Sequence, residues 1–223
     1  MNDEHRPGIR HVIWDWNGTL LDDAQACVDA VNLLLASRNL PAVSREQYLE
    51  VFDFPIRDYY LKVGFDFARD DWNALTEEYH TIYADLSRAS RLRPHARRIL
   101  DGMRARGCGL SILSACESVM LRRMMDERGI LDCFAHIYGR SDYQAHSKVD
   151  LGRTLLGETG IAPESALLVG DTTHDFEVAQ ALGARCLLMT GGHQSEARLR
   201  RCKCPVAHTL REVVDWIEEQ AGR

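Results

Sequence analysis

The chain alternates short, continuously apolar segments with stretches of helical periodicity, and this alternation restricts it to one class of fold. The apolar segments are residues 11–16, 109–113, 166–170 and 185–189, with weaker ones at 135–138 and 205–208. Apolar runs of this length, flanked by helices, are typical of strands buried on both faces of a parallel sheet. Because such strand–helix–strand connections are right-handed, the sequence predicts an α/β fold with a doubly wound, mainly parallel sheet.

Periodicity and end residues predict the helices that connect these strands. The predicted helices are residues 94–106, 117–128, 148–159, 173–182 and 210–220. Pro94 suits the first turn of its helix, whereas Gly107, Gly129, Gly160 and Gly183 suit helix ends.

One part of the chain does not alternate in this way. From residue 21 to about residue 90 the pattern is helical throughout, with breaks at Pro41 and Pro55. The expected helices are residues 22–38, 44–52, 56–63 and 69–90. An all-helical insertion directly after the first strand predicts a second, smaller domain that forms a cap over residues 21–90. Residues 1–20 and 91–223 then form the α/β core domain.

Composition and charge narrow the possible partners. The 223 residues are 45% hydrophobic and carry a formal net charge of −6, with no basic tract, which argues against nucleic acid as a partner. The first residues lack the pattern of a secretory signal, and no apolar run reaches the roughly 18 residues that a membrane span needs. The seven cysteines are scattered through apolar stretches, as reduced thiols are. We therefore expect a cytoplasmic protein with no membrane partner, either a monomer or a homodimer.

Cys202 and Cys204 are the exception among the cysteines, because they are separated by a single residue. A zinc site would need further ligands, and only His208 is close in the sequence. We interpret the pair as surface residues.

Polar residues gather where the predicted strands end, which is the edge at which open α/β sheets bind ligands. They are Asp15, Asn17, Gly18 and Thr19 after the first strand, Ser114 and Ala115 after the second, Lys148 at the start of a helix, and Asp171 and Asp175 after the strand predicted at residues 166–170. Lys148 stands out because the 27 basic residues include only two other lysines, Lys62 and Lys203. Taken singly, these residues are typical of helix caps, turns or solvated surface, but their joint order and position favour one shared site.

In this order the residues resemble the four motifs of the haloacid dehalogenase superfamily of hydrolases, in its phosphoglycolate phosphatase-like branch. Residues 15–20, DWNGTL, resemble the first motif, which is usually D-x-D-G-T-L. Ser114 with Ala115 resembles the second, Lys148 the third, and residues 170–175, GDTTHD, the fourth. The helical insertion resembles the superfamily's type-1 cap.

The resemblance implies a magnesium-dependent phosphatase for a small phosphorylated metabolite. Asp15 would attack phosphorus to form an aspartyl-phosphate, and Lys148 would neutralise nucleophile and phosphate. Ser114 would bind the phosphoryl oxygens as a preorganised donor, together with Gly18, Thr19 and Ala115. The Mg²⁺ ligands would be Asp15, the main-chain carbonyl of Asn17, Asp171 and Asp175.

The cap would select the substrate. Arg57 lies where related caps often place an arginine that contacts substrate, although it equally suits a surface arginine paired with Asp53 or Asp58. The aromatic residues Tyr59, Tyr60, Trp72 and Tyr79 have helical spacing and are interpreted as cap core. His193 follows a predicted strand and borders the site, and we assign it no direct role.

The departure from the resemblance is Asn17, at a position where phosphatases of the superfamily usually carry an aspartate that protonates the leaving alcohol. An amide cannot do this, and general acid–base catalysis is worth about 10²–10⁴ in rate. The leaving group could be good enough to need no acid, as in an acyl or aryl phosphate. Another residue, such as His174 or a cap side chain, could donate the proton. The protein could instead be a slow enzyme, or a module that binds phosphoesters or proteins.

Two other reactions of the superfamily tolerate the loss of that acid. Dehalogenases lack it but do not need the metal-binding fourth motif, which is present here. Phosphonate hydrolysis would need a lysine in the cap to form a Schiff base, and only Lys62 is available.

Overall fold

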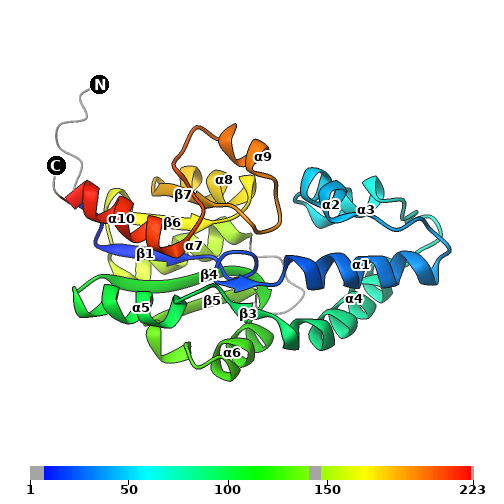
Figure 1. Ribbon diagram of the computed structural model, residues 1–223, viewed down its shortest axis with the longest axis horizontal. Coiled ribbons are helices and arrows are strands. Elements are labelled where there is room, and N and C mark those ends of the chain that lie inside the picture. Colours follow the sequence, from blue (N-terminus) through cyan, green and yellow to red (C-terminus); the bar gives the residue numbers. More distant parts are fainter. Residues whose placement is uncertain (1–7, 141–146, 222–223) are drawn as a thin grey trace.

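The centre of the structure, a computed structural model that describes residues 8–140 and 147–221, is a six-stranded sheet in the order β5–β4–β1–β6–β7–β8 (Figure 1). The strands are β1 (His11–Trp14), β4 (Gly109–Glu117), β5 (His136–Arg140), β6 (Ala166–Gly170), β7 (Arg185–Met189) and β8 (Val206–Ala207). Every pair of neighbours is parallel. The predicted α/β class with a doubly wound sheet is therefore confirmed. Residues 1–7, 141–146 and 222–223 of the predicted core domain lie outside the described residues.

Helices cover both faces of this sheet. They are α5 (Ala96–Ala105), α6 (Ser118–Glu127), α7 (Lys148–Thr159), α8 (Thr173–Leu182), α9 (Glu196–Arg200) and α10 (Leu210–Ala221). Val12 and Trp14 of β1 face one side, where α5, α6 and α10 bury their apolar residues. Ile13 faces the other side, against α7 and α8. Alternate residues of one strand thus enter two separate cores, which is why the strands are apolar throughout.

The helical insertion consists of α1 (Ala24–Ser37), α2 (Arg45–Val51), α3 (Ile56–Lys62) and α4 (Trp72–Leu86), and it extends beyond one end of the sheet (Figure 1). Ser44 begins α2 with a capping box to Gln47, and Asp71 caps α4 by accepting a bond from the Ala74 main-chain NH. A two-stranded antiparallel ribbon, β2 (Leu21–Asp22) and β3 (Arg91–Leu92), closes the base of the insertion.

The structure differs from the sequence predictions at several boundaries. The β2–β3 ribbon and α9 were not predicted: the two strands have two residues each and form no apolar run, and a helix of five residues is too short to show helical periodicity. β4 extends past the predicted end at residue 113, and the Glu117 carboxylate caps α6 by accepting from the Val119 and Met120 amides. α4 is shorter than the predicted 69–90 helix, and Pro94 lies before α5 rather than in its first turn.

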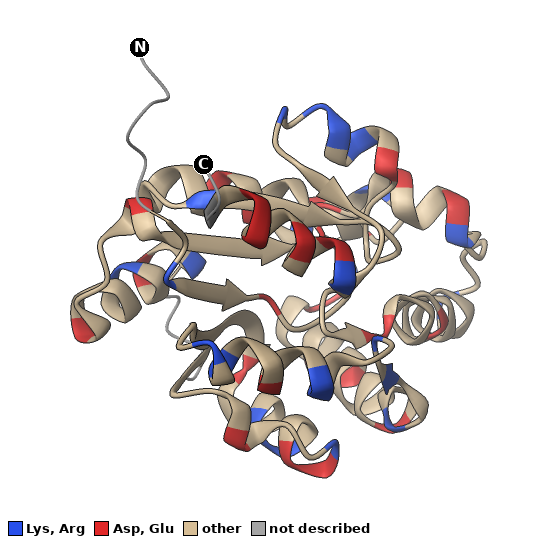
Figure 2. Ribbon diagram, turned by 60° about the vertical axis from the view of Figure 1, so that its left-hand side comes forward, with Lys and Arg blue, Asp and Glu red and all other residues tan. Residues whose placement is uncertain are grey.

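Charge is confined to the outer surface and to the ends of the strands. Figure 2 shows Lys, Arg, Asp and Glu of both signs spread over the outer helices, whereas the strands are almost free of them. Among the described residues, no helix is both long and apolar enough to cross a bilayer.

Candidate active site

Three carboxylates meet at the carboxyl ends of β1 and β6. Asp15 follows β1, Asp171 follows β6, and Asp175 lies in the first turn of α8. One oxygen from each lies within 4.8 Å of the others, and the three residues are 7%, 1% and 1% exposed. The fold therefore gathers these acids from two segments that are more than 150 residues apart in sequence, as their positions after parallel strands predicted.

Lys148 supplies the cation between them. Its Nζ lies 2.6 Å from Asp15 Oδ1 and 2.6 Å from Asp175 Oδ1. A compact ammonium with three donors fits between two carboxylates, whereas a planar guanidinium would need a wider, bidentate arrangement. This geometry is a physical reason for lysine at position 148 in an arginine-rich chain.

The carboxylates carry more negative charge than Lys148 neutralises. Burial raises the pKa of Asp15 to about 7, although Lys148 opposes this, and burial raises the pKa of Asp171 to about 6. Burial also acts on Asp175, but Lys148 and Thr172 outweigh it and lower the pKa of that carboxyl. A buried, oxygen-only cluster with surplus negative charge is suited to a hard divalent cation.

Asp171 is held in one orientation. Its Oδ1 accepts from the Thr19 hydroxyl at 3.0 Å, and its Oδ2 accepts from the His193 main-chain NH at 2.6 Å. A Cβ on Gly18 or on Gly192 would collide with the Asp171 carboxyl group. The predicted glycine at position 18 is thus required by the close approach of this carboxylate, as well as by its positive φ of 71°.

The second predicted motif lies against the same cavity. Ser114 and Ala115 belong to the distal part of β4, where the register with β5 shifts between Leu113 and Glu117. Ser114 is 1% exposed, and its Oγ accepts from the Cys116 main-chain NH at 3.1 Å. Since Oγ acts as the acceptor in this bond, the hydroxyl can still donate its proton to a group bound in the cavity.

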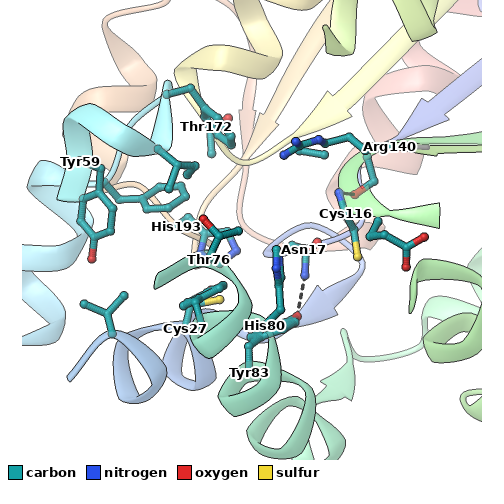
Figure 3. A pocket seen from close by; sticks show the side chains of 18 of the residues that line it. Asn17, Cys27, Tyr59, Thr76, His80, Tyr83, Cys116, Arg140, Thr172 and His193 are labelled. Carbon is teal, nitrogen blue, oxygen red and sulfur yellow. Dashed lines mark hydrogen bonds between the residues drawn. The ribbon is translucent and has the colours of Figure 1, made fainter. Parts of the chain in front are cut away.

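The structure thus brings most of the predicted site residues together. Those that line one cavity of about 200 Å³ are Asp15, Asn17, Ser114, Ala115, Lys148, Asp171 and Asp175. Gly18 and Thr19 do not line it, and they act on the site through the contacts with Asp171 given above. Figure 3 shows residues of the insertion, including Tyr59 and Tyr83, and core residues such as Thr172 around this cavity.

Arg57 and Lys62, by contrast, do not line the cavity. The Arg57 guanidinium lies over the ring of Phe67, 4.7 Å from its centroid, and is exposed. Asp53, one of its expected ion-pair partners, pairs instead with Arg198 at 3.0 Å. Lys62 is exposed at the last turn of α3.

Cys202 and Cys204 are half-buried free thiols. Across the described ranges, neither belongs to a group of side chains arranged to hold a metal ion.

Asn17 is anchored by groups that the sequence analysis did not identify. Its Nδ2 donates to Asp23 Oδ2 at 2.7 Å and to the Tyr83 hydroxyl at 2.7 Å (Figure 3). Tyr83 in turn donates to Asp23 at 2.6 Å, and the Gly18 main-chain NH donates to Asp23 Oδ1 at 2.7 Å. Because an ionised carboxylate only accepts, the amide must present its NH₂ to Asp23, and its Oδ1 takes no part in this network.

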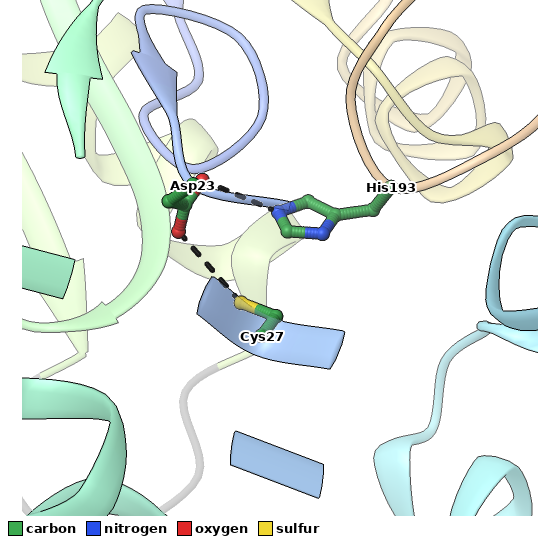
Figure 4. Close-up of side chains that lie close together, drawn as sticks. All are labelled: Asp23, Cys27 and His193. Carbon is green, nitrogen blue, oxygen red and sulfur yellow. Dashed lines mark hydrogen bonds and ion pairs between the residues drawn. The ribbon is translucent and has the colours of Figure 1, made fainter. Parts of the chain in front are cut away.

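Asp23 also pairs with His193, from the loop after β7. His193 Nε2 lies 3.6 Å from Asp23 Oδ1 (Figure 4). Its Nδ1 lies 2.9 Å from the Tyr48 hydroxyl. Burial opposes the charge on His193, but Asp23 and Asp171 outweigh it and raise the pKa of the imidazole to about 9. Burial likewise opposes ionisation of Asp23, yet its bonds to His193, Tyr83 and Asn17 keep its pKa low. The two residues form a buried ion pair at neutral pH.

The Cys27 thiol donates to the Asp23 carboxylate as well (Figure 4). Asp23, Cys27 and His193 have possible ligand atoms within 4.8 Å of one another. They do not suit a metal, since Asp23 already accepts three hydrogen bonds of 2.6–2.7 Å and burial raises the pKa of the Cys27 thiol. Asp23 was overlooked in the sequence because it occupies the N-cap position of α1, where an aspartate is expected. Only the structure reveals that Asp23 has another role, because its side chain makes no capping hydrogen bond to α1.

The other wall of the cavity is aromatic. Its rings come from the insertion and include Tyr48, Phe52, Phe54, Tyr59, Tyr60 and Trp72. Tyr59 and Tyr60 are buried, as predicted for cap core, but they also line the cavity.

Comparison with known proteins agrees with this geometry. Residues 12–189 match the family model described as haloacid dehalogenase-like hydrolase. The phosphoglycolate phosphatase of Yersinia pseudotuberculosis is 27% identical over 192 residues, which cover 83% of this chain and 82% of that protein. The 5′-nucleotidase of Pseudomonas aeruginosa is 25% identical over 211 residues, covering 92% and 95%.

A solved structure shows the same fold. The haloacid dehalogenase-like hydrolase SP0104 from Streptococcus pneumoniae superimposes with a TM-score of 0.72 at 22% identity, over 93% of this chain and 98% of that one. Because the family model spans most of the sequence and includes all four motifs, this chain belongs to the haloacid dehalogenase-like hydrolases.

Proposed function

We propose that this protein is a magnesium-dependent phosphoric monoester hydrolase that acts on a small phosphorylated metabolite through an aspartyl-phosphate on Asp15. The observation that carries the proposal is the position of Asp15, a buried carboxylate that lines the cavity while Lys148 holds one of its oxygens at 2.6 Å. The names of two relatives, a phosphoglycolate phosphatase and a 5′-nucleotidase, support a phosphate monoester as substrate.

The divalent ion would be held by Asp15, Asp171, Asp175 and the main-chain carbonyl of Asn17. Bound there, Mg²⁺ supplies positive charge to the carboxylates and the phosphoryl group. The donor set fits this ion, since all the side-chain ligands are carboxylates and Lys148 leaves their charge uncompensated.

The chain's own residues perform two displacements. In the first, an Asp15 oxygen bonds to phosphorus, and the bond from phosphorus to the leaving oxygen breaks with its electron pair on that oxygen. In the second, water attacks the same phosphorus, which releases inorganic phosphate and restores the Asp15 carboxylate. Lys148 and the Ser114 hydroxyl hold the phosphoryl group in both steps, and residues 21–90 act as the cap domain that excludes bulk water.

We propose that Asn17 orients the attacking water and does not protonate the leaving group. Asp23 and Tyr83 fix its NH₂ group, so Asn17 Oδ1 remains available to accept a hydrogen bond from the attacking water. An amide that orients water without taking its proton is a known device in phosphoryl transfer.

The test is release of inorganic phosphate from p-nitrophenyl phosphate, with and without Mg²⁺. We expect turnover that requires Mg²⁺ and that falls by at least about 10³-fold in Asp15→Asn, which removes the nucleophile but keeps the shape. Asp126→Asn, on the exposed face of α6, is the control and should match the parent. Activity that survives in Asp15→Asn would overturn the assignment of the nucleophile. If the parent turns over no phosphate compound, the phosphatase proposal fails.

A further inference from the structure

We propose that the substrate is an aryl phosphate monoester whose ring packs against the aromatic wall of the cavity while its phosphoryl group lies at Asp15. This inference rests on the proposed phosphatase function and adds the chemical class of the leaving group. Two independent features point to it: the composition of the wall and the missing proton donor at position 17.

The wall that the insertion presents to the cavity carries no charged side chain among the described lining residues. His80 is the only basic group among the described residues of this wall, and desolvation of its ring together with the nearby Arg140 lowers the pKa of that imidazole. On the core side, the buried cations Lys148 and His193 line the cavity but are already paired with carboxylates, and Arg140 is exposed and lies opposite Glu117 in the β4–β5 register. Among the described lining residues, a carboxylate such as that of phosphoglycolate therefore meets no unpaired buried cation, whereas an apolar ring does not need one.

The aromatic side chains form a continuous cluster that reaches the carboxylates. The Phe52 ring centroid lies 5.0 Å from that of Tyr48, 5.2 Å from Tyr59 and 5.7 Å from Phe54. It also lies 5.2 Å from the ring of His193, the residue whose main-chain NH binds Asp171. The wall thus adjoins the phosphoryl end of the cavity, which suits a ring attached directly to the phosphate oxygen.

The volume of the cavity and the exposed ring surface of its wall suit a ligand with one aromatic ring. An apolar cavity of about 150 Å³ is large enough to bind benzene, and this cavity of about 200 Å³ leaves room for a phosphoryl group as well. Phe52 and Phe54 are only half-buried, so they keep ring surface for the offset or edge-to-face packing that aromatic pairs prefer. The Tyr59 hydroxyl is buried with no partner in the described part of the chain, and a polar substituent on a bound ring would satisfy it.

The chemistry at position 17 leads to the same class. Asn17 cannot donate a proton, so the leaving oxygen must accept the electron pair unaided. A phenol has a pKa of about 10, whereas an aliphatic hydroxyl is closer to water at about 15.7. A phenolate can therefore leave without general acid catalysis, and it enters solution as the anion before it is protonated there.

Four phosphate compounds separate ring recognition from leaving-group ability. Phenyl phosphate and benzyl phosphate both carry a ring, but only phenyl phosphate has a good leaving group. Acetyl phosphate has a good leaving group and no ring, and 2-phosphoglycolate has neither a ring nor a good leaving group. With Mg²⁺ and the parent enzyme, we expect KM at least about tenfold lower for the two ring compounds. We expect kcat to be higher for the two good leaving groups, so that kcat/KM is largest for phenyl phosphate.

A pair of variants ties the effect to the wall. Phe54→Leu keeps an apolar side chain but removes a ring that lines the cavity, and it should raise KM for phenyl phosphate about tenfold while KM for acetyl phosphate stays unchanged. Phe67→Leu is the matched control, because Phe67 is also a half-buried ring of the insertion but does not line the cavity. It should leave both constants as in the parent.

Several results would overturn the inference. Equal KM values with and without a ring, or a preference for 2-phosphoglycolate, would remove ring recognition while Mg²⁺-dependent turnover of acetyl phosphate kept the phosphatase proposal intact. A nucleoside 5′-monophosphate with a higher kcat/KM than phenyl phosphate would replace the aryl class by nucleotides. If none of the compounds, including acetyl phosphate, is hydrolysed, the phosphatase proposal itself fails and this inference fails with it.

Discussion

At position 17 the structure gives a physical reason for an amide where a carboxylic acid is usual. One of the two hydrogen-bond partners of the side chain is the carboxylate of Asp23, which lies 2.7 Å from Asn17 Nδ2 and is 0% exposed. A second carboxylate there would lie against the first in a buried setting, where two negative charges cannot both persist. Asn17 and Asp23 therefore have to be understood as a pair.

We predict that Asn17→Asp increases hydrolysis of alkyl phosphates, with benzyl phosphate as the probe. The new carboxyl group and Asp23 must share a proton, which raises one of the two pKa values and provides the missing acid. The gain, at least about tenfold in kcat/KM, should be largest at low pH and decline as pH rises through the raised pKa. It should be absent in Asn17→Ala, and an Asn17→Asp enzyme no faster than the parent on any alkyl phosphate would refute this account.

At the scale of single elements, β1 and β4 show how a buried polar group is accommodated in an apolar sheet. His11 of β1 pairs in register with Gly109 of β4, and its Nε2 lies 2.7 Å from the Ser111 hydroxyl. A Cβ on Gly109 would collide with the His11 ring, so the imidazole takes the space that a side chain would fill. His11 is 4% exposed, and burial lowers its pKa to about 4.

We predict that His11 makes the stability of the fold depend on pH. Between pH 6.5 and about 4 the unfolded chain binds a proton at His11 and the folded chain does not, so stability is lost as pH falls through this window. The loss should be about 2 kcal/mol, after allowance for solvent screening. Urea unfolding of the parent and of His11→Asn would measure it as the difference between their pH profiles.

The control for this experiment is His208→Asn, because His208 is exposed after β8. That variant should keep the parent's pH profile. A His11→Asn protein that loses as much stability as the parent over the same pH window would contradict the prediction.

At the scale of the whole molecule, one group of contacts between the insertion and the core comes from α9 and the residue before it, Ser195. Arg198 of α9 donates to the Phe52 carbonyl at 2.5 Å and pairs with Asp53 at 3.0 Å. The Ser195 main-chain NH donates to the Leu49 carbonyl at 3.2 Å. These contacts hold the C-terminal end of α2, and with it Phe52 of the aromatic wall, against the core.

We predict that Arg198→Met loosens this contact. Bonds to a charged donor are worth about 1.5–3 kcal/mol, and about 1.4 kcal/mol corresponds to a factor of ten in an opening equilibrium. Hydrogen exchange at residues 48–52 should accelerate at least about tenfold, and KM for phenyl phosphate should rise. Arg200→Met is the control, since Arg200 lies on the same helix but pairs with Glu196 within it. Unchanged exchange in Arg198→Met would show that the other contacts suffice.

The sequence by itself was enough to predict the six-stranded sheet, most of the helices that cover it and the polar residues that meet where its strands end. Strands that are apolar throughout, such as 166–170, can be recognised because both of their faces are buried, and residues that follow parallel strands must meet at one edge. Asp15, Lys148 and Asp171 came together for this topological reason.

Only the tertiary structure decided what surrounds that edge. Asp23 and His193 lie 170 positions apart, and their pairing depends on how the loop after β7 meets the start of α1, which no local pattern encodes. Arg57 lies on the exposed side of α3 and Tyr59 on its cavity side, because the packing of the insertion sets the rotation of that helix. Local periodicity determines which elements form, whereas long-range packing determines which side chains meet, and the candidate substrate pocket depends on the second.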